Sequence, residues 1–364
     1  MAVISRDDAG TGIQRVARAL AHALIDEEVV GWDIRVVSAS RARGYHEISW
    51  GEATDNEGEH PVEGQYGDVF LGLDFSLNQV RWHRKQLARF RKNGGSVWFV
   101  VYDLLPIEHP EWFSGRNVLR FKIWLETIAG IADGFFCISA QTESDLTRAL
   151  SERFALSDGY TSSIIPMGYD IREAPSAPPS TNDREPRVPF DASSPFVLMV
   201  GTLEPRKGHA DILAAFEGLW RQGIDSRLVL VGRAGWKTQK LCDTIRKHPE
   251  HGSRLLWLND VTDHELEEIY ASCQGVIVGS HGEGFGLPLI EALGYGKPVL
   301  ARDLPVFRAH QKLGVCYFPS DCTPEALSSY ICDWLHDVAS GQSKVTKPTA
   351  NWADAAKTVF RAIA

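Results

Sequence analysis

Short apolar runs recur along this chain and alternate with longer amphipathic stretches. The runs at 96–101 and 275–279 are apolar almost throughout, which is typical of strands buried on both faces of a parallel sheet. A helical stretch at 288–293 follows the second run. This alternation in both halves predicts an α/β fold of two doubly wound domains. The other predicted strands are 34–38, 68–72, 134–139, 164–169, 195–200, 228–232, 255–258 and 299–301.

Proline marks the predicted boundary between the two domains. Residues 171–196 contain six of the chain's 18 prolines, among serine, asparagine and charged residues, which is typical of an extended linker. We therefore predict an N-terminal domain at 1–172, a linker at 173–194 and a C-terminal domain at 195–350. A last amphipathic helix is expected at 351–364.

Composition excludes several classes of protein. With 44% hydrophobic and 23% charged residues the chain can form full cores, and its net charge of -9 disfavours nucleic acid as a partner. No apolar run approaches the roughly 20 residues of a membrane span, and the first residues lack a signal-peptide pattern, so we expect a cytoplasmic location. The six cysteines form no C-x-x-C pair, which indicates reduced thiols rather than a zinc site.

A glycine-rich loop at 282–286 leads from the strand at 275–279 into the following helix. Such a loop is an anion site, because its free N–H groups and the positive end of the helix dipole face the ligand. Two carboxylates, Glu283 and Glu291, flank this site with seven residues between them. They are suited to accept hydrogen bonds from ribose or hexose hydroxyls.

A basic turn follows the strand at 195–200. It reads G-T-L-E-P-R-K-G from Gly201 to Gly208. Arg206 offers a planar fork of donors and Lys207 a compact charge, and both suit a diphosphate. In a transfer reaction they would neutralise negative charge that builds on a leaving nucleoside diphosphate.

These two motifs carry a family resemblance. E-G-F-G-L-P-L-I-E resembles the E-x7-E signature of retaining glycosyltransferases of family 4, and the basic turn resembles that family's G-x-x-x-x-R-K-G motif, in the family's order. The resemblance implies a GT-B fold, in which two Rossmann-like domains face an interdomain cleft and the last helix crosses back onto the first domain. It also implies a nucleotide diphosphate sugar as substrate, with no cofactor. The absence of a D-x-D triad agrees with donor binding without a metal.

The resemblance assigns roles to residues of both halves. Glu291 would bind the ribose, Glu283 the sugar hydroxyls, and Phe285 and Gly286 would present backbone N–H groups. The implied catalytic residues are Arg206, Lys207, Glu283 and Asp103. The implied donor-binding residues are Gly201, Thr202, Arg206, Lys207, Gly232, Arg233, Glu283, Gly284, Phe285, Gly286, Leu287, Glu291 and Ser139.

The N-terminal half is similar to a subset of the family that builds bacterial surface polysaccharides such as O-antigen. The run A-G-T-G-I-Q-R-V resembles the subset's acceptor-side glycine loop, which nominates Gly10, Thr11 and Gly12; a simple helix-start turn is the alternative. Many relatives have a histidine directly before Asp103, where this chain has Tyr102. The first strand, at residues 1–4, is unusually short.

The subset implies a hexosyltransferase, with mannose from GDP-mannose as the preferred donor and a lipid-linked or oligosaccharide acceptor. The basic stretch 81–92, with six Lys or Arg, is interpreted either as a contact to the inner membrane surface or as a solvated helix face. A nucleotide-binding or scaffold protein without transfer activity is the alternative function. A Rossmann oxidoreductase is disfavoured, because no G-x-G-x-x-G follows the first strand.

Overall fold

The computed structural model divides the chain into two compact units, residues 1–176 with 350–364 and residues 177–349, each with its own sheet. The structure describes residues 12–27, 29–48, 61–169 and 194–364. The first strand predicted at 1–4 and the linker predicted at 173–194, apart from residue 194, lie outside these ranges.

The first unit is built on a parallel sheet of strand order β3-β4-β5-β6. The inner strands β4 and β5 are buried almost throughout, as expected for strands covered on both faces. Val101 of β4 pairs with Cys137 of β5, so the segments that follow these strands leave the same edge of the sheet. The strands are β3 (Val69–Gly72), β4 (Ser96–Val101), β5 (Gly134–Cys137) and β6 (Thr161–Ile164).

Helices pack around this sheet, and α5 contributes the large buried side chains Phe121 and Trp124 to the core. The last helix, α13, belongs to this unit and packs against α1. The ring of Trp32, in the segment after α1, lies 5.9 Å from the ring of Phe360 in α13. The helices of the unit are α1 (Gly12–Asp26), α2 (Gln79–Trp82), α3 (Arg84–Lys92), α4 (Leu105–Glu108), η1 (Pro110–Trp112), α5 (Gly115–Ile131), α6 (Ala140–Phe154) and α13 (Trp352–Ile363).

The second unit contains a fully parallel sheet of order β12-β11-β10-β7-β8-β9. The chain starts in the middle at β7, builds outward through β8 and β9, and then returns to the other side of β7 to form β10. The strands are β7 (Phe196–Val200), β8 (Arg227–Val231), β9 (Leu255–Leu258), β10 (Gly275–Val278), β11 (Val299–Arg302) and β12 (Cys316–Phe318).

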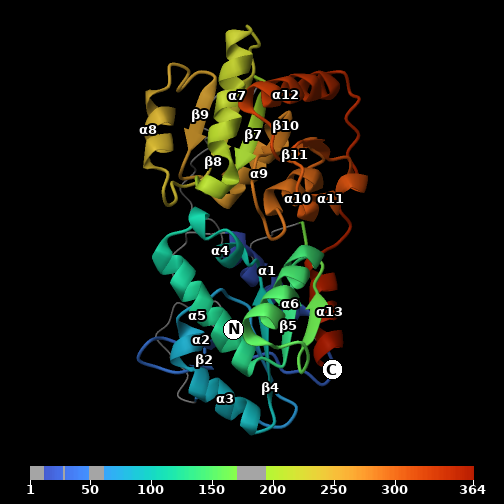
Figure 1. Cartoon of the computed structure of the whole chain (residues 1–364). Helices are drawn as coiled ribbons and strands as arrows, with labels where there is room; N and C mark the ends of the chain where they lie inside the picture. Colours follow the sequence, from blue (N-terminus) through green and yellow to red (C-terminus); the bar gives the residue numbers. More distant parts are fainter. Residues whose placement is uncertain (1–11, 28, 49–60, 170–193) are drawn as a thin grey trace, which may run out of the picture. The chain divides into compact units, whose positions relative to one another are not determined.

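Apolar helix faces close the core of the second unit. Helix α7 packs alongside α12 (Figure 1), where Ser328 donates a hydrogen bond of 2.7 Å to the carbonyl of Ala215. Helix α9 begins at a capping box between Thr262 and Glu265. The helices are η2 (Pro205–Lys207), α7 (His209–Arg221), α8 (Gln239–Lys247), α9 (Asp263–Ser272), α10 (Leu287–Gly294), α11 (Pro305–Arg308), η3 (Gln311–Leu313) and α12 (Pro324–Ala339).

Two predicted strands differ from the structure. Residues 34–38 were expected in the parallel sheet, but this segment contributes β1 (Val37–Ser38), which pairs antiparallel with β2 (His46–Glu47). Its side chains explain the difference: Ile34 is 39% exposed, and Arg35 forms an ion pair with Glu47 across the hairpin. The strand expected at 164–169 corresponds to β6, which covers residues 161–164 instead. These more polar residues pair with β5 and form the edge of the sheet.

Two further features concern the described residues as a whole. No helix among them combines the length and the apolar character needed to cross a membrane. All six cysteines are free thiols, and those at positions 137, 242 and 273 are buried.

Candidate active site

The strand order of the second unit creates a switch point between β7 and β10. In an open parallel sheet, ligands bind beyond the carboxyl ends of the strands where the connections diverge to opposite sides. The loop after β7 is the basic turn at 201–208, and the loop after β10 is the glycine-rich loop that continues to Gly286. The fold therefore brings the two sequence motifs together, although some 75 residues separate them along the chain.

The two loops touch through their backbones. The N–H of His281 donates a hydrogen bond of 2.7 Å to the carbonyl of Arg206. Gly208 has a φ of +73°, and a Cβ at this position would lie 2.2 Å from the carbonyl oxygen of Gly279. A glycine is required there for both reasons, since the conformation is left-handed and the approach is too close for any side chain.

Arg206 and Lys207 both reach the carboxylate of Glu283. Arg206 Nη1 lies 2.9 Å from Glu283 Oε2, and the ammonium of Lys207 contacts Glu283 Oε1. Ser280 donates a further hydrogen bond of 2.7 Å to the same oxygen. On its other side, Arg206 lies 2.8 Å from a carboxylate oxygen of Glu204, which is 3% exposed. Two cations therefore face two carboxylates, and the cluster carries no net charge.

Electrostatics within this cluster favour the ionised form of Glu283. Burial alone would raise its pKa, but Lys207 and Arg206 outweigh burial and hold the pKa at about 2. The neighbouring His209 is buried beneath the basic turn, and burial together with Lys207 lowers its pKa to about 3. Its ring is therefore neutral at physiological pH and adds no charge to the cluster.

A buried arginine supports the end of β10. Arg302 is 2% exposed and donates to the carbonyl of Gly279 at 3.0 Å and to the carboxylate of Asp211 at 2.7 Å. Asp211 also lies 3.1 Å from His281 Nε2, and the hydrogen bond from His281 is the first cause of the lowered pKa of Asp211. The loop that carries Glu283 is thus attached to both β11 and α7.

Glu291 lies one helix turn inside α10. It is 4% exposed, and its Oε2 accepts a hydrogen bond of 2.7 Å from the hydroxyl of Tyr270. The rings of Tyr270 and Tyr295 stack at 5.3 Å beside it. The hydrogen bond from Tyr270 therefore holds this carboxylate in a defined position.

The start of α10 has the geometry of an anion site. Gly286 precedes the helix with a φ of +93°, and a Cβ there would meet the ring of Phe307 at 2.3 Å. Phe285 packs edge-on against His310 with ring centroids 5.4 Å apart. Leu287 is the first helical residue, and Gly284 is buried in the turn before it. This packing fixes the direction of the first N–H groups of the helix.

The ends of β7 and β8 lie side by side. The N–H of Gly201 donates to Val231 at 2.9 Å, and the N–H of Leu203 donates to the carbonyl of Arg233 at 2.8 Å. A Cβ at Gly232 would lie 2.1 Å from the carbonyl oxygen of Gly201. Thr202 lies between Gly201 and Leu203 in the segment after β7. The predicted donor-binding residues 201, 202, 232 and 233 therefore lie at the same edge of the sheet.

The remaining predicted site residues belong to the first unit. Asp103 accepts a hydrogen bond of 3.2 Å from the N–H of Leu105, and Ser139 is the N-cap of α6 through the N–H of Thr142 at 3.1 Å. Both therefore have a local structural role at the carboxyl edge of their sheet. Gly12 is the exposed first residue of α1, and Gly10 and Thr11 lie outside the described residues.

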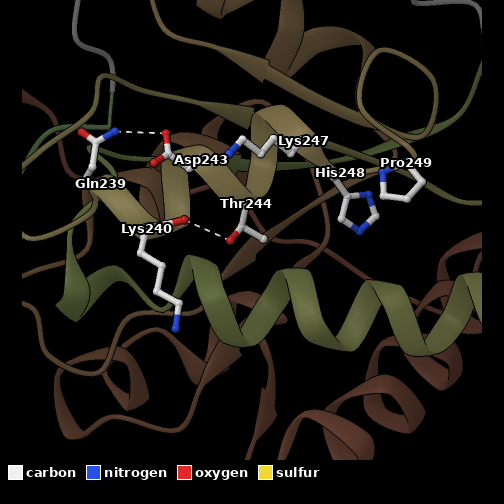
Figure 2. Close-up of a pocket in the computed structure, with 7 residues that line it drawn as sticks. All are labelled: Gln239, Lys240, Asp243, Thr244, Lys247, His248 and Pro249. Atoms are coloured by element: carbon white, nitrogen blue, oxygen red, sulfur yellow. Dashed lines mark hydrogen bonds between the residues drawn. The ribbon is translucent and has the colours of Figure 1, made fainter.

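A surface hollow of about 730 Å³ lies elsewhere on the second unit, along α8 and the turn after it. In Figure 2 its side chains form local contacts, among them a hydrogen bond of 3.0 Å between Gln239 and Asp243. The hollow contains none of the predicted site residues, and we assign it no role. Across the parts of the chain that are described, no three His, Cys, Asp or Glu side chains gather in a metal-binding arrangement.

A family model for glycosyl transferases group 1 matches residues 181–358. The serotype-specific mannosyltransferase WbdA of Escherichia coli is 34% identical over 342 residues, which cover 92% of this chain and 42% of WbdA. The chain belongs to the group 1 glycosyl transferases. The O-antigen chain mannosyltransferase B of Escherichia coli is 31% identical over 147 residues, covering 39% of this chain and 37% of that protein.

Solved structures confirm the predicted α/β GT-B fold of this group 1 glycosyl transferase. WaaG, a glycosyltransferase involved in lipopolysaccharide biosynthesis, matches with a TM-score of 0.61 and 14% identity over 98% of this chain and 93% of WaaG. Anabaena HepE in complex with UDP and glucose matches with a TM-score of 0.56 and 19% identity, over 80% of this chain and 72% of HepE. The chain spans about two fifths of the length of WbdA, at 42%.

Several residues of the site were not singled out from the sequence. Glu204 lies within the basic turn, and Ser280 lies just before the glycine-rich loop. The carboxylate of Glu204 and the hydroxyl of Ser280 are visible in the sequence and could have identified both as possible partners of the motif residues. Tyr270 lies 21 residues before Glu291 on a different helix, and only the tertiary structure reveals the hydrogen bond between them. Arg302 and Asp211 are 91 residues apart, so their pairing had no local signal.

Proposed function

We propose that this group 1 glycosyl transferase is a retaining enzyme that transfers a hexose from a nucleotide diphosphate sugar to a saccharide acceptor in bacterial polysaccharide biosynthesis. The observation that carries the proposal is the meeting of Arg206, Lys207 and Glu283 at the switch point, beside the N-terminus of α10. Mannose from GDP-mannose is the preferred donor, which the printed functions of WbdA and mannosyltransferase B support.

The charge cluster suggests how the donor binds. A diphosphate would bind Arg206 and Lys207, and both of these cations are paired with Glu283. Donor binding must therefore weaken these ion pairs, which releases the Glu283 carboxylate to accept hydrogen bonds from the sugar. The ribose hydroxyls would bind Glu291, whose position Tyr270 holds.

Bond breaking follows from the same arrangement. The bond between the anomeric carbon and the phosphate oxygen breaks, and negative charge builds on the diphosphate between the two cations and the helix N-terminus. The acceptor hydroxyl oxygen bonds to the anomeric carbon on the same face, and its proton passes to the departing phosphate oxygen. Because Arg206 and Lys207 supply positive charge here, we expect donor binding to need no metal or other cofactor. Undiminished transfer in excess EDTA is the expected result.

We propose that the acceptor is a lipid-linked saccharide or an oligosaccharide at the cytoplasmic face of the inner membrane. Helix α3 exposes its basic side chains while Leu87 and Phe90 are buried, and Trp82 at the end of α2 is 41% exposed. This face suits anionic lipid headgroups. Sedimentation with vesicles that contain phosphatidylglycerol should detect binding, and pure phosphatidylcholine vesicles are the control.

The second candidate is a nucleotide-binding protein of the same fold without transfer activity. Tyr102 motivates it, because the resemblance drawn from the sequence leads us to expect a histidine at this position. This tyrosine is 3% exposed and its hydroxyl donates to the carbonyl of Leu73. This candidate predicts nucleotide binding with no turnover of any donor.

A thermal-shift panel with GDP, UDP, ADP and CMP tests the proposal, followed by transfer assays with the sugar of the selected nucleotide. A nucleotide at about 100 times its dissociation constant should add about 2.7 kcal/mol of stability, and Glu291→Ala should abolish the effect. A selective shift with GDP and turnover of GDP-mannose would support the proposed enzyme. A selective shift without turnover would favour the second candidate, and no shift with any nucleotide would refute both.

A further inference from the structure

Two carboxylates hold Arg206, and they are attached to different parts of the fold. Arg206 Nη2 lies 2.8 Å from Glu204 Oε1, and Arg206 Nη1 lies 2.9 Å from Glu283 Oε2. Glu204 belongs to the basic turn, two residues before Arg206, whereas Glu283 belongs to the loop after β10. Because a guanidinium is planar and its donors form a rigid fork, two contacts on different nitrogens fix its orientation.

The backbone around Glu204 is fixed by contacts on both sides. Before it, the carbonyl of Leu203 accepts a hydrogen bond of 2.8 Å from the N–H of Gly235, in the segment after β8. After it, Glu204 is the N-cap of η2, and its carbonyl accepts a hydrogen bond of 3.0 Å from the N–H of Lys207. Pro205 begins η2 and restricts the backbone further. The position of Glu204 is therefore set by the segments that follow β7 and β8.

The two contacts of Arg206 should respond differently to a bound donor. Under the proposed function, the diphosphate weakens the ion pair between Arg206 and Glu283. An arginine side chain that lost its fixed position would regain rotamer freedom, and ordering it again would reduce the affinity for the donor. The contact with Glu204 prevents this loss of order, because Glu204 lies in the same turn as Arg206. Nη1 then becomes available to a phosphate while Nη2 stays in place.

Glu204 is not placed to touch the donor itself. Its side chain is 3% exposed, so it presents almost no surface to a ligand. We propose that Glu204 is a positioning residue of the donor site, which keeps the guanidinium of Arg206 directed at the diphosphate after Glu283 has been displaced. This inference rests on the proposed transferase function. It gives the two carboxylates different roles, since Glu283 exchanges partners when the donor binds and Glu204 does not.

Removal of Glu204 would have two effects of opposite sign. Loss of its negative charge favours the binding of any anion, whereas loss of the fixed guanidinium weakens directed hydrogen bonds to phosphate. Two substitutions separate these effects. Glu204→Gln removes the charge but keeps an oxygen that accepts a hydrogen bond from Arg206, and Glu204→Ala removes both. If charge alone mattered, both variants would bind GDP more tightly than the wild type.

Isothermal titration calorimetry with GDP and with guanosine tests the inference. We expect Glu204→Ala to weaken GDP binding by about tenfold or more, as for the loss of a hydrogen bond between charged groups, and Glu204→Gln to retain the wild-type affinity within about threefold. Guanosine has no phosphate, so its affinity should be the same in both variants and in the wild type. Glu250→Ala is the matched control, because it breaks another glutamate–arginine ion pair, with Arg254 directly before β9 at the opposite edge of the sheet.

A double-mutant cycle separates positioning from a structural role. If Glu204 acts through Arg206, Glu204→Ala should change the GDP affinity by less than about twofold when Arg206 is already replaced by alanine. An equal loss of affinity in both backgrounds, or weakened guanosine binding, would overturn the inference. It would also be overturned by tighter GDP binding in Glu204→Ala, or by a Glu204→Gln variant that binds GDP as poorly as Glu204→Ala.

Glu204→Asp provides a second variant for the cycle if Glu204→Ala does not fold. It keeps the charge, but its side chain is shorter by one methylene and ends further from Arg206, so GDP binding should weaken as expected for alanine. A wild type that binds no GDP would contradict the proposed transfer from GDP-mannose, and this inference with it. Wild-type GDP binding without coupling between Glu204 and Arg206 would overturn only the role of Glu204.

Discussion

Replacing Glu283 by glutamine tests the charge cluster of the donor site most directly. The change keeps the size of the side chain and removes the negative charge that faces Arg206 and Lys207. The two cations lower the pKa of Glu283 from 4.5 to about 2 despite its burial. Each pK unit corresponds to about 1.4 kcal/mol, so the charge contributes about 3 kcal/mol to the free energy of unfolding at neutral pH.

The sign of the pH dependence follows from the direction of this shift. A carboxyl group with a lowered folded-state pKa stabilises the protein above its unfolded-state pKa of 4.5, and this contribution is lost as the pH falls towards about 2. In Glu283→Gln the free energy of unfolding should therefore fall less than in the wild type as the pH is lowered through this range. At pH 7 we expect a loss of about 3 kcal/mol, or about 6–12 °C in Tm for a unit of this size.

The same variant should respond differently to ligand. Without the competing carboxylate, Arg206 and Lys207 are available to a diphosphate, so GDP should raise the Tm of Glu283→Gln by more than that of the wild type. Transfer should nevertheless fall, because the sugar loses its contact. Scanning calorimetry between about pH 3 and pH 8, with and without GDP, measures these effects, and Glu267→Gln on the exposed face of α9 is the matched control. If the variant has the wild-type Tm at pH 7 and its Tm falls at acidic pH as much as that of the wild type, the proposed stabilisation by the Glu283 charge is refuted.

Three further substitutions test the geometry of the donor site. Arg206→Ala and Lys207→Ala should each lower turnover by about 100-fold or more, because each removes charge from the leaving diphosphate; near-wild-type rates in both would contradict the diphosphate assignment. Gly208→Ala should lower the free energy of unfolding by about 3 kcal/mol or more, because the new Cβ combines a strained φ with a clash against the carbonyl oxygen of Gly279. A change of less than about 1 kcal/mol in denaturant unfolding would contradict this close approach. Tyr270→Phe should weaken GDP binding about tenfold by calorimetry because Glu291 loses its 2.7 Å hydrogen bond, and an unchanged affinity would argue against a ribose contact.

Much of the fold was predictable because the buried strands of a parallel sheet are continuous apolar runs. The strands at 96–101 and 275–279 were predicted within one residue for this reason. The segment at 34–38 is a shorter apolar run interrupted by Arg35, and its residues Val37 and Ser38 pair antiparallel with β2 instead of joining the parallel sheet. A pattern of residue types contains no information about which partner a short strand finds.

By itself, the sequence determined which groups stand at the ends of the strands. The basic turn at 201–208 and the glycine-rich loop at 282–286 each follow an apolar run directly, so their chemistry and their sheet edge were visible without a structure. The tertiary structure alone decided which charges neutralise one another. Glu283 meets Lys207 and Arg206 because the chain returns to the far side of β7, and a strand order of this kind is set by long-range packing.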